Sequence, residues 1–518
     1  MSQEFKFGKK ILNTLTTGMY KNAMFIYREY IQNAADAIDD AMEQGLICPE
    51  GFQIHVKVDS RKRDISIEDN ATGIPQDVVR ETLGNVGDSK KDPKKKKGFI
   101  GIGRLGGLGY CERVVFETSY IGEESKTISV WEAAKIREII HDPSVNDDAQ
   151  SVLRNTVSFQ TEPCDKKTHF FKVTLCGVTK ENDDLLDMTK VYPYLQMVSP
   201  AEFNYTEFPH KKTIRDFIEK NGLPKLSEYQ IYLNQQKITK GYKSKLKVPG
   251  QKDSVEIKDV QLGLLKDDDT ILGWYWYGIT DFSGTMEKLW QSGMRLRKGN
   301  IQIGEEDCLY QHKMWRERRG NFYFFGEVHA LDPELIPNGR RDYFEENSAC
   351  RRFERTLKDL FDKMLDIVYD ASHLRSAASR VEKVKAEIKG LQEKIQAGNF
   401  DDEESRAEAI EKVKGLNEQF NSDVCRLNKI KDKLDDKKDD IIVGAAVSSI
   451  VDCVDVSTRP VKPIRQPECS QLPSLATDNL TPPQKVILEL VKEVLASKLP
   501  PEELDSIWSE VLKKIKML

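Results

Sequence analysis

The sequence lacks any long uninterrupted hydrophobic run. None of its 518 residues lie in a stretch that approaches the ~18 apolar residues of a membrane span, and the charged first ten residues lack the apolar segment of a signal peptide. A marked excess of one charge is also missing, because 79 Lys and Arg stand against 84 Asp and Glu, for a net charge of -5. This balance argues against a surface built throughout to hold nucleic acid, although it leaves a local nucleic-acid patch open. We expect a soluble, cytoplasmic protein with no membrane partner.

Paired cysteines are missing as well. The nine cysteines are scattered, without a Cys-x-x-Cys pair and without a histidine at metal-ligand spacing. This pattern predicts reduced thiols rather than disulfides or a structural zinc site.

The length of the chain exceeds what one hydrophobic core supports, so several domains are expected. Residues 1–195 mix helix-period and strand-period segments, which is the pattern of an α+β layer domain. Residues 196–370 alternate strand candidates with helical segments and predict a second α/β domain. The clearest strand candidates of this second region are 229–233, 271–277 and 321–328.

The C-terminal third has a different pattern. Apolar residues repeat at heptad spacing within 371–440 and predict two long helices joined at 398–402, either folded back as a hairpin or paired with another chain. Residues 441–482 contain Ser, Thr and Pro throughout and predict a mobile linker. Residues 483–518 predict two short amphipathic helices that serve docking or dimerisation.

A long amphipathic helix is predicted at 20–44, where apolar residues recur at spacings of three and four. Glu29, Asn33 and Asp36 occupy positions i, i+4 and i+7 of this helix, so they share one face. By itself, such a polar stripe is typical of a solvated helix face. The segments that follow this helix in the sequence indicate a binding site instead.

Two alternating runs, 52–58 and 65–69, follow the helix and predict a pair of antiparallel strands that ends at Asp69. A buried carboxylate at a strand end can accept a hydrogen bond from an exocyclic amine such as that of adenine. Gly73 follows closely, and a glycine lets the backbone approach a flat ligand.

A glycine-rich segment, which includes Gly98, Gly101 and Gly103, completes the candidate site. Glycine at this density lets backbone N–H groups turn toward phosphate oxygens. Residues 101–106 formally match the dinucleotide fingerprint, but they follow a lysine-rich loop rather than a strand, so the required context is missing. No Gly-x-x-x-x-Gly-Lys-Ser/Thr string occurs, which excludes an ordinary P-loop.

The segments 28–39 and 69–74 and the glycine segment resemble, in order, the three nucleotide motifs of the gyrase, heat-shock-90, histidine-kinase and MutL ATPase (GHKL) superfamily. The heat shock protein 90 family is the nearest match within it, because residues 5–22 also fall where that family has its N-terminal strand and first helix. The resemblance implies a two-layer α/β sandwich of the Bergerat type, a second α/β middle domain like ribosomal protein S5, and a helical coiled-coil C-terminal region.

The resemblance also implies roles for the site residues, with ATP and Mg²⁺ as ligands. Glu29 would be the general base on the attacking water, and Asn33 would hold the Mg²⁺ that bridges the phosphates. Asp69 would bind the adenine amine, and residues 84–97 would form a lid. The remaining residues expected to bind ATP are Asp36, Gly73, Gly98, Gly101, Gly103 and Thr168, although Lys167 stands where a glycine usually precedes the threonine.

The resemblance extends into the second region. Residues 338–347 resemble the middle-domain segment whose arginine reaches the γ-phosphate, which makes Arg341 the second catalytic residue, with Arg340 as a neighbour that could substitute. The alternative is an arginine-rich start of a surface helix. The resemblance ends near residue 370, so it implies ATP binding more directly than client folding.

The implied function is that of an ATP-hydrolysing chaperone or molecular clamp that closes and dimerises through its N-terminal domains and acts on a protein client. A DNA clamp of the MutL or MORC kind stays open, and so does an ATP-sensing scaffold in a multi-protein assembly, for example in defence. The DNA hypothesis draws on the lysine-rich lid, on the helical hairpin and on a basic cluster of Arg295, Arg297, Lys298, Arg316, Arg318 and Arg319.

Overall fold

The computed structural model describes residues 7–15, 22–85, 103–248, 254–400, 402–454, 456–461, 482–496 and 498–500, with a few short pieces between 503 and 511. The chain forms two compact units, one of residues 1–376 with 428–455 and one of residues 377–427 with 456–518. Gly98, Gly101 and most of the predicted lid lie outside the described residues.

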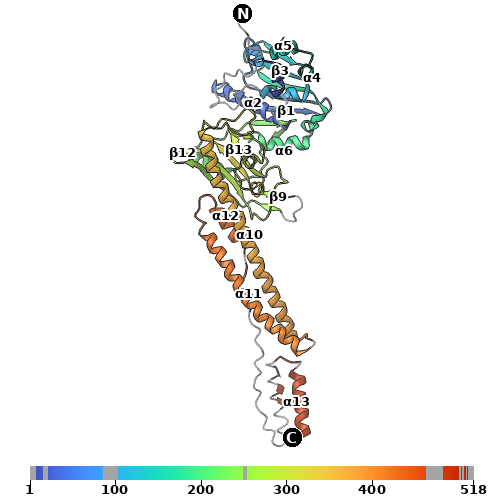
Figure 1. Ribbon diagram of the computed structural model, residues 1–518, viewed down its shortest axis with the longest axis vertical. Coiled ribbons are helices and arrows are strands. Elements are labelled where there is room, and N and C mark those ends of the chain that lie inside the picture. Colours follow the sequence, from blue (N-terminus) through green and yellow to red (C-terminus); the bar gives the residue numbers. More distant parts are fainter. Residues whose placement is uncertain are drawn as a thin grey trace. The chain divides into compact units, whose positions relative to one another are not determined.

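An eight-stranded sheet forms the centre of the N-terminal domain (Figure 1). Its strand order is β5-β4-β3-β6-β2-β1-β7-β8, and β1 and β7 are its parallel pair. The strands are β1 (Gln53–Asp59), β2 (Asp64–Asp69), β3 (Cys111–Ser119), β4 (Ser125–Trp131), β5 (Val157–Pro163), β6 (Phe170–Val178), β7 (Gln230–Leu233) and β8 (Gln236–Ile238). The helices are α1 (Lys10–Leu15), α2 (Phe25–Glu43), α3 (Val79–Gly84), α4 (Ala133–His141), α5 (Ala149–Thr156) and α6 (Met188–Val198), with the 3₁₀ segments η1 (Gly103–Gly109) and η2 (Lys180–Leu186). This arrangement confirms the α+β class.

The predicted antiparallel pair is β1 and β2, which meet with Ile54 opposite Asp69. Burial alternates along β1, because Ile54 and Val56 are buried whereas His55 and Lys57 are exposed. The buried face packs against helices, and the other face of the strand meets solvent. Asp69 therefore ends its strand at the buried centre of the sheet.

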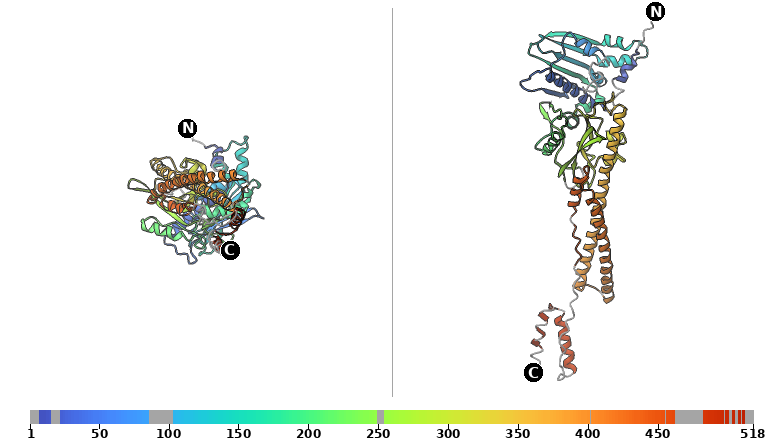
Figure 2. Two further views of the ribbon diagram at one scale, coloured as in Figure 1. Left: turned by 90° about the horizontal axis from the view of Figure 1, so that it is seen from below. Right: turned by 90° about the vertical axis from the view of Figure 1, so that its left-hand side faces the viewer.

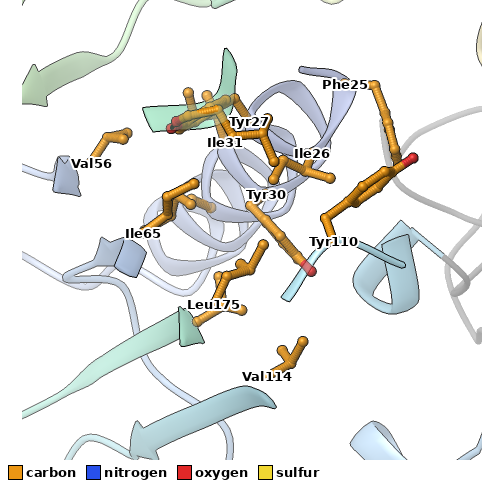
Figure 3. Packing of buried hydrophobic residues seen from close by; sticks show 14 of the residues in the cluster. Phe25, Ile26, Tyr27, Tyr30, Ile31, Val56, Ile65, Tyr110, Val114 and Leu175 are labelled. Atoms are coloured by element: carbon orange, nitrogen blue, oxygen red, sulfur yellow. Dashed lines mark hydrogen bonds between the residues drawn. The ribbon is translucent and has the colours of Figure 1, made fainter. Parts of the chain in front are cut away.

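Helix α2 crosses the buried face of the sheet, and its position is set by a continuous apolar core (Figure 3). It begins at Phe25, where the side-chain oxygen of Asn22 accepts the N–H of Met24 at 3.0 Å, and ends before Gly45, which has a φ of +76°. Each large side chain buried here stabilises the fold by roughly 1.5 to 3 kcal/mol. The core side chains of α2 in Figure 3 are Phe25, Ile26, Tyr27, Tyr30 and Ile31, and those of the strands include Val56, Ile65, Val114 and Leu175.

The strand predicted at 229–233 is present, but it does not belong to the second domain. It forms β7, which pairs in parallel with β1 and extends the N-terminal sheet, with β8 beside it. Ile231 and Leu233 are buried in the N-terminal core. The exposed edge of β1 explains this placement, since an unpaired strand edge is stabilised by any segment that can reach it.

The second domain contains a five-stranded sheet of order β11-β12-β15-β13-β14. The strand predicted at 271–277 is confirmed within β12, but the one predicted at 321–328 begins later, at Phe325, because the short helix α9 precedes it. The five strands of this sheet are β11 (Asp259–Asp267), β12 (Thr270–Ile279), β13 (Gly293–Lys298), β14 (Ile301–Ile303) and β15 (Phe325–Ala330). A separate two-stranded sheet consists of β9 (Lys245–Leu246) and β10 (Val255–Glu256). The helices are α7 (Lys211–Lys220), α8 (Cys308–Gln311) and α9 (Arg318–Asn321).

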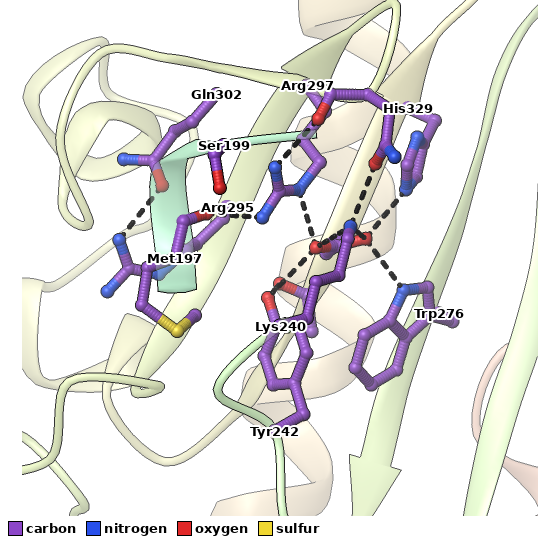
Figure 4. A network of polar contacts seen from close by, with 12 residues as sticks. Met197, Ser199, Lys240, Tyr242, Trp276, Arg295, Arg297, Gln302 and His329 are labelled. Atoms are coloured by element: carbon purple, nitrogen blue, oxygen red, sulfur yellow. Dashed lines mark hydrogen bonds and ion pairs between the residues drawn. The ribbon is translucent and has the colours of Figure 1, made fainter. Parts of the chain in front are cut away.

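A network of charged side chains is fully buried in this second domain (Figure 4). Glu327 of β15 accepts hydrogen bonds from Lys240 at 2.7 Å and from His329 at 2.9 Å, and it pairs with Arg297 of β13 at 2.5 Å. Burial alone would raise the pKa of Glu327, but Arg297 and Lys240 hold it well below its usual value. Arg297 also donates to the carbonyl of Met197 in α6. The network thereby ties the last helix of the N-terminal domain to the second sheet.

The network corrects the expectation of a basic surface cluster. Arg295 and Arg297 are buried, with exposures of 4% and 0%, so neither is available to a DNA backbone. Arg316 and Arg318 are exposed, but each forms an ion pair with a carboxylate, to Asp362 and to Glu287. The sequence could not distinguish the buried arginines from the exposed ones. Alternating arginines on a strand indicate surface residues unless a buried acidic partner is known.

Two long helices follow the second domain, α10 (Ser348–Ala397) and α11 (Glu403–Asp435). Within the second unit, α11 runs back along α10, and Lys412 lies 2.8 Å from Glu387 (Figure 2). The hairpin alternative is therefore the one found. Helix α13 (Pro482–Ala496) follows. Among the described residues, no helix has both the length and the apolar character that crossing a bilayer requires.

Part of the predicted linker is a helix. Residues 444–452 form α12 (Gly444–Asp452), which packs on β12 of the first unit. Ala446, Val447 and Ile450 are buried at helical spacing. The composition of the whole stretch 441–482 concealed this short apolar run.

We expect Glu327→Gln to destabilise the second domain by about 3 kcal/mol, because it leaves Lys240 and Arg297 buried without an anion. Urea denaturation followed by tryptophan fluorescence measures this, since Trp274 and Trp276 lie in the same core. Glu287→Gln is the matched control.

In the control, Glu287 pairs with Arg318 at 2.6 Å on the surface, where about half of each side chain is exposed. Its loss should cost less than about 1 kcal/mol. Equal effects of the two substitutions would contradict the importance of the buried network.

Candidate functional site

The polar face of α2 holds three candidate residues. Glu29 and Asp36 are buried, with exposures of 4% and 1%, and Asn33 between them is partly buried. The Oε1 atom of Glu29 is inaccessible to solvent and has no hydrogen-bond partner among the residues that the structure describes. A buried carboxylate oxygen without a partner is costly, so the position indicates a role other than stability.

Gly103 lies against this carboxylate. A Cβ atom at residue 103 would stand 2.6 Å from the Oε2 atom of Glu29, so any larger residue would displace it. Gly106 and Gly107 pack equally closely on Phe25 and Tyr30. Some of these glycines are therefore needed because η1 packs closely on α2. The sequence pattern had indicated only phosphate binding for them.

The second domain contributes Arg341 to the same place. Its Nε atom lies 3.4 Å from the Oε2 atom of Glu29, and the residue is 7% exposed. The backbone of Arg341 has a φ of +52°, a conformation that is unfavourable for a residue with a side chain. The alternative of a solvated helix start does not agree with this burial.

Gly304 holds this arrangement from both sides. Its N–H donates to the carbonyl of Arg341 at 2.8 Å, and its carbonyl accepts from Arg28 of α2 at 3.0 Å. Its φ is +67°, and a Cβ atom would meet the sulfur of Cys308 at 2.5 Å. Arg28 and Gly304 were not predicted as site residues, although Arg28 immediately precedes Glu29 in the motif.

Asp69 is buried at the end of β2 and accepts the N–H of Ala71 at 3.1 Å. Burial raises the pKa of Asp69 to about 8, which outweighs the opposite effect of that N–H. Gly73 follows with a φ of +75°, and a Cβ atom there would lie 2.0 Å from the carbonyl oxygen of Ser119. Glycine is thus required at this position by the backbone alone.

Thr168 does not lie in the sheet beside Asp69. It precedes β6, in a turn where its N–H donates to the carbonyl of Asp165. The residue of β6 that pairs directly with Asp69 is Phe171. Only the strand register, which the sequence did not define, reveals this neighbour.

The structure thus brings together Glu29, Gly103 and Arg341, and it places Asp69 and Gly73 on the strand and loop next to α2. These groups fit an adenine nucleotide. A Cβ atom at Gly103 would push the carboxylate of Glu29 aside, and the Oε1 atom of that carboxylate has no hydrogen-bond partner among the described residues. No group of three or more His, Cys, Asp or Glu that could hold a metal is found in the described part of the chain.

A pH dependence follows from Asp69. Its folded-state pKa of about 8 lies above the ordinary value, so between about pH 4 and pH 8 the folded protein binds more protons than the unfolded chain. Stability should therefore fall as pH rises through this window, by up to roughly 1.4 kcal/mol per pH unit relative to Asp69→Asn. Urea denaturation at pH 5, 6, 7 and 8 measures the difference, with Asp77→Asn at an exposed carboxyl as the control. A difference that stays constant over this range would contradict the prediction.

Comparison with known proteins agrees with this geometry. Residues 23–160 match the family described as histidine kinase-, DNA gyrase B-, and HSP90-like ATPase. This range contains α2, β1, β2 and η1, and therefore every described candidate residue except Thr168 and Arg341.

The similar curated proteins are bacterial chaperones. The "Chaperone protein HtpG" of Shewanella loihica is 29% identical over 145 residues, which are 24% of this chain and 22% of the relative. That of Buchnera aphidicola subsp. Schizaphis graminum is 22% identical over 394 residues, or 69% of this chain and 55% of the relative. The chain thus spans about a quarter to about half of the length of these relatives. Residues 23–160 therefore resemble the histidine kinase-, DNA gyrase B-, and HSP90-like ATPases, and a larger part of the chain is similar to the HtpG chaperones.

Proposed function

We propose that this protein binds ATP and hydrolyses it to ADP and phosphate at the site formed by Glu29, Gly103 and Arg341. The observation that carries the proposal is the contact of a buried helix carboxylate with an arginine from a second domain, at 3.4 Å, beside a glycine whose Cβ would displace that carboxylate. Hydrolysis of a phosphoanhydride needs both an activated water and a cation that neutralises charge on the transferred group.

Glu29 would accept a proton from the attacking water through its Oε1 atom, which makes no hydrogen bond to any described residue. Arg341 would neutralise charge on the γ-phosphate, and its present partner, the Oε2 atom of Glu29, holds it within reach. Asn33 would hold Mg²⁺, which would supply positive charge next to the phosphates.

The other proposed binding residues surround the base and the phosphates. Asp69 would accept the adenine amine, because it ends β2 with one carboxylate oxygen engaged by Ala71. The close approach of Gly73 to the backbone of Ser119 leaves no space for a side chain at this position of the loop. The further residues proposed to bind ATP are Asp36, Gly98, Gly101, Gly103 and Thr168.

We further propose that the ATPase drives a heat-shock-90-like chaperone or molecular clamp that works as a homodimer on a protein client. The similarity to HtpG over 69% of the chain supports this, because it extends past the ATPase domain into the second domain. The DNA clamp has less support, since Arg295 and Arg297 of the basic cluster are buried.

Glu29→Gln tests the proposed base. We expect ATP turnover to fall by about 100-fold or more while the Kd for ATP changes little, because the amide keeps the shape of the carboxylate but cannot accept the proton. A phosphate-release assay and calorimetry measure the two quantities. Glu43→Gln at the exposed end of the same helix is the control, and undiminished turnover in Glu29→Gln would remove Glu29 from this role.

Gly304→Ala tests whether the second domain must contact α2 for hydrolysis. The added methyl group would meet Cys308 and the carbonyl of Asp342 at 2.7 Å, so the backbone that holds Arg341 must shift. We expect turnover to fall about tenfold or more with little change in the affinity for ATP.

Gly222→Ala is the matched control, because Gly222 has a similar φ of +62° but no atom within 4 Å of an added Cβ. Both variants carry the same backbone strain, so only the collision near Arg341 differs between them. Equal turnover in the two variants would count against the contact.

A further inference from the structure

Arg104 follows Gly103 and is held next to the proposed base. The hydroxyl of Tyr30 donates to the carbonyl of Arg104 at 3.0 Å, and Tyr30 follows Glu29 in α2. Because Gly103 lies against the carboxylate of Glu29, the backbone of Arg104 is fixed within one residue of the catalytic centre. The position of this arginine is therefore set by the same packing that sets the base.

The guanidinium of Arg104 has no counter-ion within the described part of the chain. It donates one hydrogen bond to the carbonyl of Asn85, just after α3, and no described residue forms a hydrogen bond with its buried Nε atom. No carboxylate among the described residues forms an ion pair with it. Burial lowers the pKa of Arg104 to about 10, with no acid group to oppose the shift.

Arg63, another partly buried arginine of the domain, is neutralised differently. It also donates to backbone carbonyls, of Val178 and Thr179, but it lies 2.5 Å from the carboxylate of Asp183. A partly buried cation without a nearby anion is unfavourable unless an anionic ligand neutralises it. The planar N–H donors of a guanidinium match the oxygens of a phosphate.

We propose that Arg104 binds the polyphosphate chain of the nucleotide through its side chain, in addition to the backbone groups of the glycine segment. The inference rests on the proposed function, because it places the phosphates beside Glu29 and Gly103. Arg104 is then a phosphate-binding residue that discriminates ATP and ADP from adenosine, whereas Asp69 serves the base common to all three.

Calorimetry on the full chain with adenosine, ADP and ATP in the presence of Mg²⁺ tests the proposal. We expect Arg104→Met to weaken ADP and ATP binding about ten- to a hundredfold, with unchanged adenosine binding and an unchanged melting temperature of the free protein. Arg104→Lys, which keeps the charge but not the fork, should restore part of the lost affinity.

Two comparison variants distinguish phosphate binding by Arg104 from a general effect of lost positive charge and from a loss of fold stability. Arg80→Met removes an exposed charge from α3, where the guanidinium lies over Phe159, and should leave all three affinities unchanged. Arg137→Met removes an arginine that only holds the carbonyls of Leu108 and Cys111, so it should lower the melting temperature and weaken all three ligands alike.

Each result decides the matter. If Arg104→Met binds ATP as tightly as the wild type, or behaves like Arg137→Met, the phosphate role is overturned while the proposed ATP site stands. If the wild type binds neither ADP nor ATP, the proposed function itself fails and the role of Arg104 fails with it.

Discussion

The contact between Glu29 and Arg341 is the interaction on which the rest of the site depends. It joins a carboxylate on a buried helix to a cation from another domain, so both must be held by their surroundings. The apolar core beneath α2 holds the first, and the left-handed backbone at Arg341, braced by Gly304, holds the second. Steric exclusion at Gly103 then keeps side chains away from the carboxylate. A cation placed by a second domain makes the chemistry depend on the arrangement of the two domains.

The buried network around Glu327 also connects the two domains. Arg297 pairs with Glu327 and donates to the carbonyl of Met197 in α6, so opening this joint would break a hydrogen bond of a buried charge. Buried ion pairs are weak contributors to stability but strongly penalise the loss of one partner. The sequence pattern predicted a surface position for Arg295 and Arg297, because the partners that stabilise their burial lie far away in the chain.

Local periodicity predicted much of the fold and of the candidate site. The α2 helix and the pair β1 and β2 follow from spacings of three to four and of two, since each buries one face of its own. Two failures share one cause, which is that the stabilising contact is distant in sequence. These are the pairing of β7 with β1 and the burial of helix α12 on β12.

The sequence by itself determined that Glu29, Asn33 and Asp36 share a helix face and that a carboxylate ends a strand, because these relations depend only on the local backbone. Only the tertiary structure decided that Arg341 reaches Glu29 and that Arg104 has no counter-ion among the described residues. The physical reason is that the burial of a side chain and its charged partners depend on distances in three dimensions and not on separation along the sequence. Residues hundreds of positions apart become neighbours only when the apolar cores place them there.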